Sequence, residues 1–319
     1  MIEDPRVVEH RTHVPEHLGR AAAFLASLQA LDGPLAGNVS PWRSTPYPDF
    51  HGTLQAIWVW ARYAELTRDE TYLTNIERAW TFVDTQFARY VPVVLGPQAP
   101  YEAPYDCASV LLAAVADERL FQDGQHRSRA MQASEVLATY LEELRENPGR
   151  EFRDGGWLAY TLAEYGRLQD DPVLVDAARV FVERAYPREF AGFLSEPDRD
   201  DVMFDFISTS ATRVLATISA LGAIPFTGAW LRECVLPAAP RGFARRVRDE
   251  HVWNATVAAA LGAAYRISHA EEFLSPYLAI IAELRRRDVE GVCAMARDAS
   301  YPEFESSPTF FWAFAVDML

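Results

Sequence analysis

The connections between helical segments in this chain of 319 residues alternate between short and long. Helical periodicity starts near residue 15 and predicts helices at 15–31, 51–68, 70–90, 105–122, 125–144, 155–169, 172–186, 205–222, 225–235, 251–268, 270–288 and 307–318. The best candidate for a strand is the short segment 91–95. Tight turns such as TRDE (67–70) and QDDP (169–172) follow the even-numbered helices, and long segments rich in proline and glycine follow the odd-numbered ones. Antiparallel helix pairs would place all the long segments, which commonly carry function, at one end.

A weak internal repeat accompanies this alternation. ARYAELTRDETYL (61–73) is similar to AEYGRLQDDPVL (163–174) and AAYRISHAEEFL (263–274), so a tyrosine recurs about every 100 residues, or two helix pairs. Six pairs with a fixed loop asymmetry favour an all-α fold, a closed (α/α)6 barrel or toroid of six helical hairpins, over an open solenoid. An ordinary bundle of shuffled helices is the alternative. We expect residues 1–319 to form one domain, with 1–14 as an N-terminal arm.

The hairpin pattern also carries a resemblance to a known family. Tyr-x-x-Leu, a polar turn, Tyr-Leu and a helix that contains AWTFV (79–83) resemble the six-hairpin glycosidase superfamily. The resemblance implies an (α/α)6 barrel, a pocket at the end of the long loops, and carbohydrates as the leading substrate class.

Composition excludes several other functions. The formal net charge of −15 argues against a nucleic-acid partner, which requires a basic surface. The chain has no lysine, so Schiff-base, pyridoxal phosphate and P-loop chemistry are excluded for the chain alone. No apolar run reaches the roughly 18 residues that span a membrane, and the N-terminus lacks the apolar stretch of a signal peptide. We therefore expect a cytoplasmic protein without a cofactor, whose three separate cysteines are buried thiols.

The N-terminal ends of the even-numbered helices, which would form an inner ring, gather acidic and aromatic residues. A helix start carries unpaired N–H groups and a partial positive charge, although Asp there is often only a cap. The predicted catalytic residues are Asp49, Asp106, Asp200, Asp205 and His251. The predicted substrate-binding residues are Trp42, Tyr47, His51, Tyr105, Trp157, Trp253, Tyr301, Glu303 and Glu305.

These residue types fit sugar chemistry. Tryptophan and tyrosine faces stack on sugar rings, and glycoside cleavage uses two carboxyl groups. Lyases and epimerases instead pair a base with an acid, often histidine or tyrosine. His51 and His251 both stand at inner helix starts, and the related N-acylglucosamine 2-epimerase barrels use histidines as acid/base groups. No metal is expected, because the aspartate run at 198–201 lacks the spacing of a calcium loop.

The same aspartate run supports an alternative function. DRDD (198–201) matches the DxDD pattern of class II terpene cyclases, which implies that Asp200 protonates an isoprenoid alkene with support from Asp198 and Asp201. Crowded carboxylates would raise one pKa, and aromatic walls would stabilise a carbocation. Val202-Met203 replaces the family's Thr-Ala, and the chain has room for one barrel rather than two. A second alternative is a non-catalytic toroid that binds a peptide or protein.

Overall fold

The computed structural model describes residues 4–40, 48–94, 103–146, 155–193, 214–222, 251–289, 292–293 and 306–319. These residues are nearly all helical, which confirms the all-α class. The helices are α1 (Pro5–Leu28), η1 (Gly33–Leu35), α2 (Phe50–Thr67), α3 (Leu73–Val94), α4 (Ala103–Phe121), α5 (Arg127–Glu146), α6 (Gly155–Leu168), α7 (Pro172–Phe193), the segment 214–221, α11 (His251–Ser268), α12 (Glu271–Arg287) and α13 (Ser306–Asp317). Strands β1 (Asp288–Val289) and β2 (Val292–Cys293) form one short antiparallel pair.

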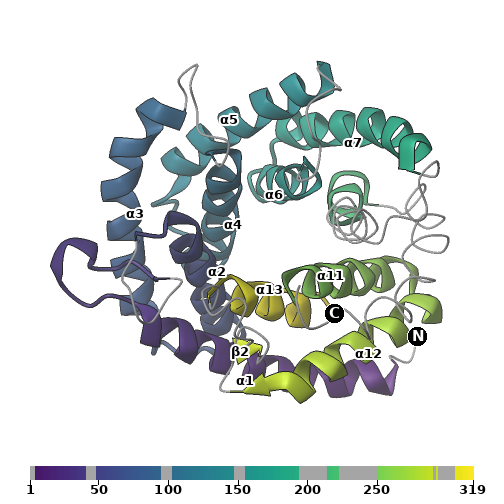
Figure 1. Ribbon diagram of the computed structural model, residues 1–319, viewed down its shortest axis with the longest axis horizontal. Coiled ribbons are helices and arrows are strands. Elements are labelled where there is room, and N and C mark those ends of the chain that lie inside the picture. Colours follow the sequence, from purple (N-terminus) through teal and green to yellow (C-terminus); the bar gives the residue numbers. More distant parts are fainter. Residues whose placement is uncertain are drawn as a thin grey trace.

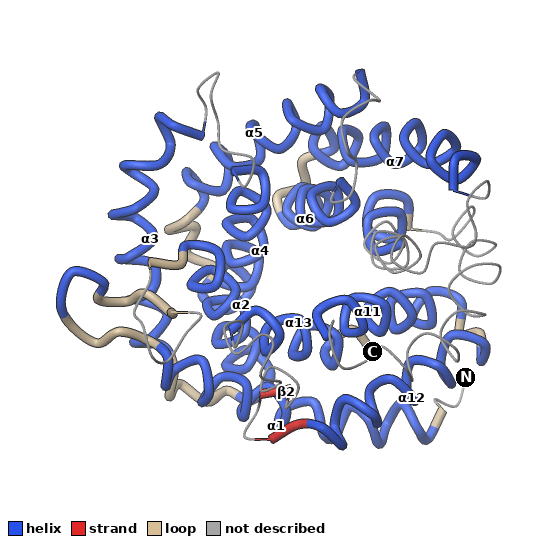
Figure 2. The backbone as a smooth tube through the Cα atoms, viewed as in Figure 1, coloured by secondary structure: helices blue, strands red, loops and turns tan. Residues whose placement is uncertain are grey.

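The helices lie in an inner and an outer set (Figure 1). Helices α2, α4, α6, α11 and α13 and the segment 214–221 stand around the centre, while α1, α3, α5, α7 and α12 lie outside them. Along the inner set, α2 packs against α4 and α4 against α6, and α13 packs against both α11 and α2. Each outer helix α3, α5, α7 and α12 packs against the inner helix that precedes it in the chain. Figure 2 shows how little of the described chain is not helical.

The inner helices are buried on every face. Residues 52–61 of α2, 106–117 of α4, 155–163 of α6 and 255–264 of α11 are all buried. Runs of this kind contain many alanines, which let neighbouring helices approach closely. Helix α3 is amphipathic instead, with Ile76, Ala79 and Val83 turned inward and charged residues outward. The core therefore lies within the inner set and between the two sets.

The short turns that follow the inner helices share one backbone geometry. Each contains a residue with a positive φ, between 51° and 63°, namely Arg68, Gln122, Asp170, Gly222 and His269. The next residue in three of the turns, Asp69, Asp123 or Asp171, accepts the N–H two positions on, at 2.9 Å in each case. A left-handed residue ends a helix, and the aspartate fixes the turn into the next one. The weak sequence repeat thus corresponds to a repeated turn structure.

Two local predictions were wrong. Helix α1 begins at Pro5 rather than near residue 15, and Val7 and His10 in the expected arm are buried. Asp4 caps this helix through the N–H of Arg6, and Pro15 lies inside it without ending it. Residues 91–94, expected as a strand, belong to the last turn of α3.

Within the described part of the chain, no helix combines the length and the apolar character that crossing a membrane would require.

The shared turn geometry predicts a stabilising substitution. Arg68 is exposed, has a φ of 63° and donates its N–H to the carbonyl oxygen of Ala64, a bond that glycine retains. Because glycine reaches this region without strain from a Cβ atom, we expect Arg68→Gly to raise the free energy of unfolding by about 0.5–1 kcal/mol. Urea denaturation measures the change. Arg78→Gly on the exposed face of α3 is the control and should cost about 1 kcal/mol. Equal losses in both variants would contradict the explanation.

Candidate functional site

The start of α2 is fixed by a small network of polar side chains. Asp49 is the N-cap, and its carboxylate oxygen accepts the N–H of Gly52 at 2.9 Å. The side-chain oxygen of Asn38 accepts the N–H of Asp49 at 2.7 Å, and the hydroxyl of Thr53 donates to the Asp49 carbonyl oxygen at 2.6 Å. Burial raises the pKa of Asp49, while the hydrogen bonds to its carboxylate lower it. Asp49 therefore acts as the N-cap. The hydrogen bond from the Gly52 N–H to its carboxylate orients the first turn of α2.

His51 lies in this first turn and is held through both ring nitrogens. Its Nδ1 is 2.7 Å from the hydroxyl of Ser109 on α4, and its Nε2 is 2.7 Å from the side-chain nitrogen of Gln55 on α2. Burial lowers the pKa of His51 to about 4, so the imidazole is neutral at pH 7. A neutral imidazole held between a hydroxyl and an amide has one donor and one acceptor nitrogen. These two contacts fix the orientation of the imidazole.

Gln55 adds a second feature to this contact. Its amide nitrogen faces His51, while its Oε1 is buried and has no hydrogen-bond partner among the described residues. Rotating the amide by half a turn would bring Oε1 to the imidazole, where it could accept an N–H from Nε2. The Gln55 side chain can therefore pair with either protonation state of Nε2.

Helix α4 brings a buried acid to the same end of the inner set. Asp106 is 9% exposed and lies in the first turn of the helix, three residues before Ser109. Residues three apart share a helix face, so Asp106 lies one turn from the hydroxyl that contacts His51. Tyr105 beside it is partly buried. Burial raises the pKa of the Cys107 thiol to about 12, which leaves this cysteine protonated and unreactive.

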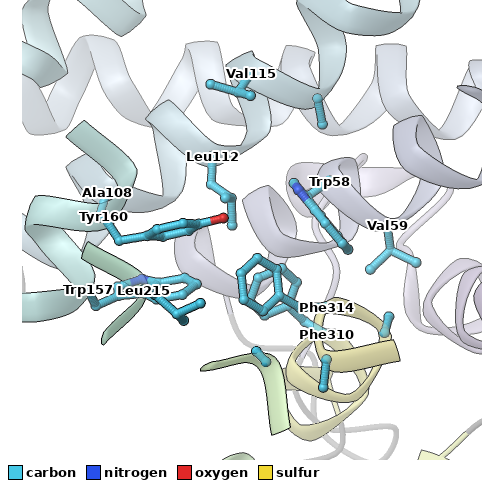
Figure 3. Packing of buried hydrophobic residues seen from close by; sticks show 14 of the residues in the cluster. Trp58, Val59, Ala108, Leu112, Val115, Trp157, Tyr160, Leu215, Phe310 and Phe314 are labelled. Atoms are coloured by element: carbon cyan, nitrogen blue, oxygen red, sulfur yellow. The ribbon is translucent and has the colours of Figure 1, made fainter. Parts of the chain in front are cut away.

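Trp157 begins a cluster of aromatic rings in the centre of the molecule (Figure 3). Its ring lies 5.5 Å from that of Tyr160 and 5.4 Å from that of Phe314, and Trp58 lies 5.5 Å from both Phe310 and Phe314. Such edge-to-face and tilted contacts stabilise a core. The aromatic cluster, defined by these five residues, fills the space between the inner helices. Trp157, a member of this cluster, is 6% exposed, and its role as a platform for a sugar ring stays a prediction.

Several predicted site residues lie outside the described part of the chain. These are Trp42, Tyr47, Asp200, Asp205, Tyr301, Glu303 and Glu305. Helix α11 begins at His251 as expected, although the side chains of His251 and Trp253 are not described. The structure therefore brings together His51, Asp49 and the acid-bearing start of α4. The site residues predicted near the N-terminal ends of the fourth and sixth inner helices stay predictions.

A cavity of about 400 Å³ lies at the opposite end of the inner helices, where the short turns are. The sequence analysis placed the pocket only at the end of the long loops. It missed this cavity because it assigned no role to the arginines at the C-terminal ends of the inner helices. It also missed Ser109 and Gln55 as partners of His51. The spacing of Gln55, four residues after His51 on one helix face, was the available signal.

Among the described residues, no group of three or more histidine, cysteine and acidic side chains is arranged to hold a metal ion. Comparisons with protein-family models, with curated proteins and with solved structures found no match to the chain. The site must therefore be interpreted from its own chemistry.

The low pKa of the partly buried His51 imidazole predicts acid sensitivity. The pKa of His51 is about 4 in the folded protein and about 6.5 in an unfolded chain, so only the unfolded chain gains a proton between these values. The free energy of unfolding should fall as the pH falls from 6.5 to 4. We expect His51→Gln to lose less stability than the wild type over this interval, by on the order of 2 kcal/mol.

Urea denaturation at a series of pH values measures the effect, with His13→Gln as the matched control because His13 is exposed on α1. The explanation fails if the two variants show the same pH dependence. An imidazole NMR titration of His51 with a midpoint near 6.5 would also contradict it.

Proposed function

We propose that the chain closes into a single (α/α)6 toroid of helical hairpins. Two observations support closure. The cavity at the short-turn end is lined in succession by α2, α4, α6, the segment 214–221, α11 and α13. The last helix also meets the first ones, because Asp317 of α13 pairs with Arg62 of α2 at 2.6 Å and Val316 accepts a hydrogen bond from His10 of α1 at 2.9 Å. A ring of this kind presents all its inner helix starts to one side.

We infer that this side carries the active site of a carbohydrate-active enzyme of the glycoside hydrolase, lyase or epimerase type. The observation that supports it is the neutral His51, held by Gln55 and by Ser109, which lies one helical turn from Asp106 on α4. A base and an acid at the same end of neighbouring inner helices suit removal and return of a proton, the chemistry of lyases and epimerases. His51 would act as the base and Asp106 as the acid, with His251 as a second acid/base group.

The low pKa of His51 favours an acidic sugar as the substrate within this class. A base whose pKa is about 4 is weak at neutral pH. A carboxylate brought close to the imidazole would raise that pKa, because a nearby negative charge favours the protonated form. A uronic acid would therefore activate His51 when it binds. It would also carry the acidified C–H bond that a base attacks.

The isoprenoid alternative depends on residues 198–201, which lie outside the described residues. The aromatic segments expected to line its pocket are 57–60 and 310–314, and their residues Trp58, Phe310 and Phe314 pack ring against ring in the aromatic cluster. The described interior therefore gives this alternative no specific support. The same holds for a toroid that only binds a peptide or protein.

Activity screening tests the proposal. Purified protein is incubated in D₂O with neutral sugars, oligosaccharides, uronic acids and prenyl diphosphates, and products are followed by NMR. We expect turnover of a uronic acid or another sugar, with deuterium incorporated at the carbon that loses its proton. We expect His51→Ala and Asp106→Asn each to lower kcat/KM by about a hundredfold or more, as removal of a general acid or base does. Ser109→Ala should lower it less, because Ser109 only positions His51.

His13→Ala on α1 is the control and should keep full activity. Circular dichroism establishes that each variant is folded. Turnover of a prenyl diphosphate without turnover of any sugar would support the alternative instead. Full activity in folded His51→Ala and Asp106→Asn would overturn the site assignment.

A further inference from the structure

The cavity of about 400 Å³ is separate from the proposed active site. It lies at the C-terminal ends of the inner helices, and the aromatic cluster forms its floor through Trp58, Tyr160 and Phe314. Leu112, Val115 and Leu215 line its apolar wall (Figure 3). His51 and Asp106 do not line it. A volume of this size matches a site for a small molecule.

Charged side chains surround the mouth of this cavity. They are Arg62, Arg119, Arg167 and Arg266, with Glu164 and Asp317. The six groups have a formal charge of +2, in a chain whose formal net charge is −15. The carbonyl ends of the inner helices carry partial negative charge at this end and offset part of that excess. Whether the cavity favours an anionic or a cationic ligand therefore depends on which of its donors and acceptors already have partners.

The two carboxylates are already engaged. Glu164 accepts a hydrogen bond from the hydroxyl of Ser219 at 2.6 Å and one from Arg119 at 3.4 Å. Asp317 accepts one from Arg62 at 2.6 Å, and Arg62 also pairs with Glu65 at 2.6 Å. Both acids thus lock neighbouring inner helices together. They have little capacity left for a cationic ligand.

Several donors, in contrast, are unused. The indole N–H of Trp58 and the hydroxyl of Tyr160 line the cavity, and neither has a hydrogen-bond partner among the described residues. Burial raises the pKa of Tyr160 well above 10, so the hydroxyl keeps its proton. Arg266 forms no ion pair with another described residue, and Arg167 lies 3.9 Å from Glu164, beyond hydrogen-bond distance. A guanidinium group offers five N–H donors and no acceptor.

We propose that this cavity binds a small organic anion, in which a carboxylate or phosphate group is attached to an apolar body. The anionic group would bind Arg167 and Arg266 at the mouth, because planar guanidinium groups match both carboxylate and phosphate oxygens. The apolar body would lie against Leu112, Val115 and Phe314, and the donors of Trp58 and Tyr160 would bind further oxygens deeper in the cavity. A ligand of this kind satisfies every unused donor and needs no acceptor from the protein.

Isothermal titration calorimetry with matched probes tests the proposal. The probes are 3-(4-hydroxyphenyl)propionate and 4-hydroxyphenyl phosphate, whose phenol oxygen can accept from Trp58 and Tyr160, with neutral 3-(4-hydroxyphenyl)propanol and inorganic phosphate as comparisons. We expect saturable binding of at least one organic anion with a Kd of about 1 mM or below, and binding at least tenfold weaker for the alcohol and for inorganic phosphate. The organic anion that binds more tightly shows whether the cavity prefers a carboxylate or a phosphate group. Added salt should weaken binding.

Variants then assign the binding to this cavity. Arg167→Gln/Arg266→Gln should weaken the organic anion at least tenfold, since both side chains are exposed and their loss leaves the fold intact. Tyr160→Phe should weaken it about threefold or more, by loss of one hydrogen bond. Arg179→Gln on α7, an arginine paired with Asp176 and Glu183 away from the cavity, should change nothing.

His51→Ala should retain the binding. The binding test is therefore independent of the proposed catalytic function. The proposal is overturned if neither organic anion binds, or if the alcohol or inorganic phosphate binds as tightly as the anions. It is also overturned if the double arginine variant binds with unchanged affinity.

Discussion

A helix that is apolar on every face must be covered on every face, and this constraint governs the whole arrangement. In α4 all residues from Asp106 to Asp117 are buried, and α2, α6 and α11 contain similar runs. Such helices cannot lie on a surface, since exposure of their apolar area costs about 25 cal/mol per Å². Each needs inner neighbours on two sides, an amphipathic helix outside and a filled centre. The outer helices and the aromatic cluster supply this cover.

The filled centre has a consequence for function. Trp58, Trp157, Tyr160, Phe310 and Phe314 pack against one another between the inner helices. One end combines the cap network of α2 with His51 and Ser109, and the other contains the arginine-rimmed cavity. The two proposed sites therefore lie at opposite ends of the inner helices.

Much of the fold could be predicted because helical periodicity and turn chemistry are local. The bounds of α2, α6 and α11 agree with the prediction within a residue or two, and the tight turns lie where Asp69, Asp123 and Asp171 indicated. Helix α1 was predicted too short, because Pro15 resembles a helix start. Its first turns are stabilised by distant contacts, among them His10 with Val316. Contacts between residues so far apart in sequence leave no local pattern.

The candidate site was predictable only in part, for a related reason. Acids at helix starts and arginines near helix ends both follow from the helix dipole, so the segregation of charge between the two ends is expected without any ligand. Asp49 illustrates this, since its carboxylate caps α2. The helix dipole does not explain a neutral histidine that is held through both ring nitrogens. Nor does it explain a cavity whose carboxylates have hydrogen-bond partners while several of its donors have none among the described residues. Those features depend on which side chains meet across helices, as His51 meets Ser109 and Glu164 meets Ser219. Function is therefore better sought in the polar groups that helix stability leaves unexplained than in the charges it requires.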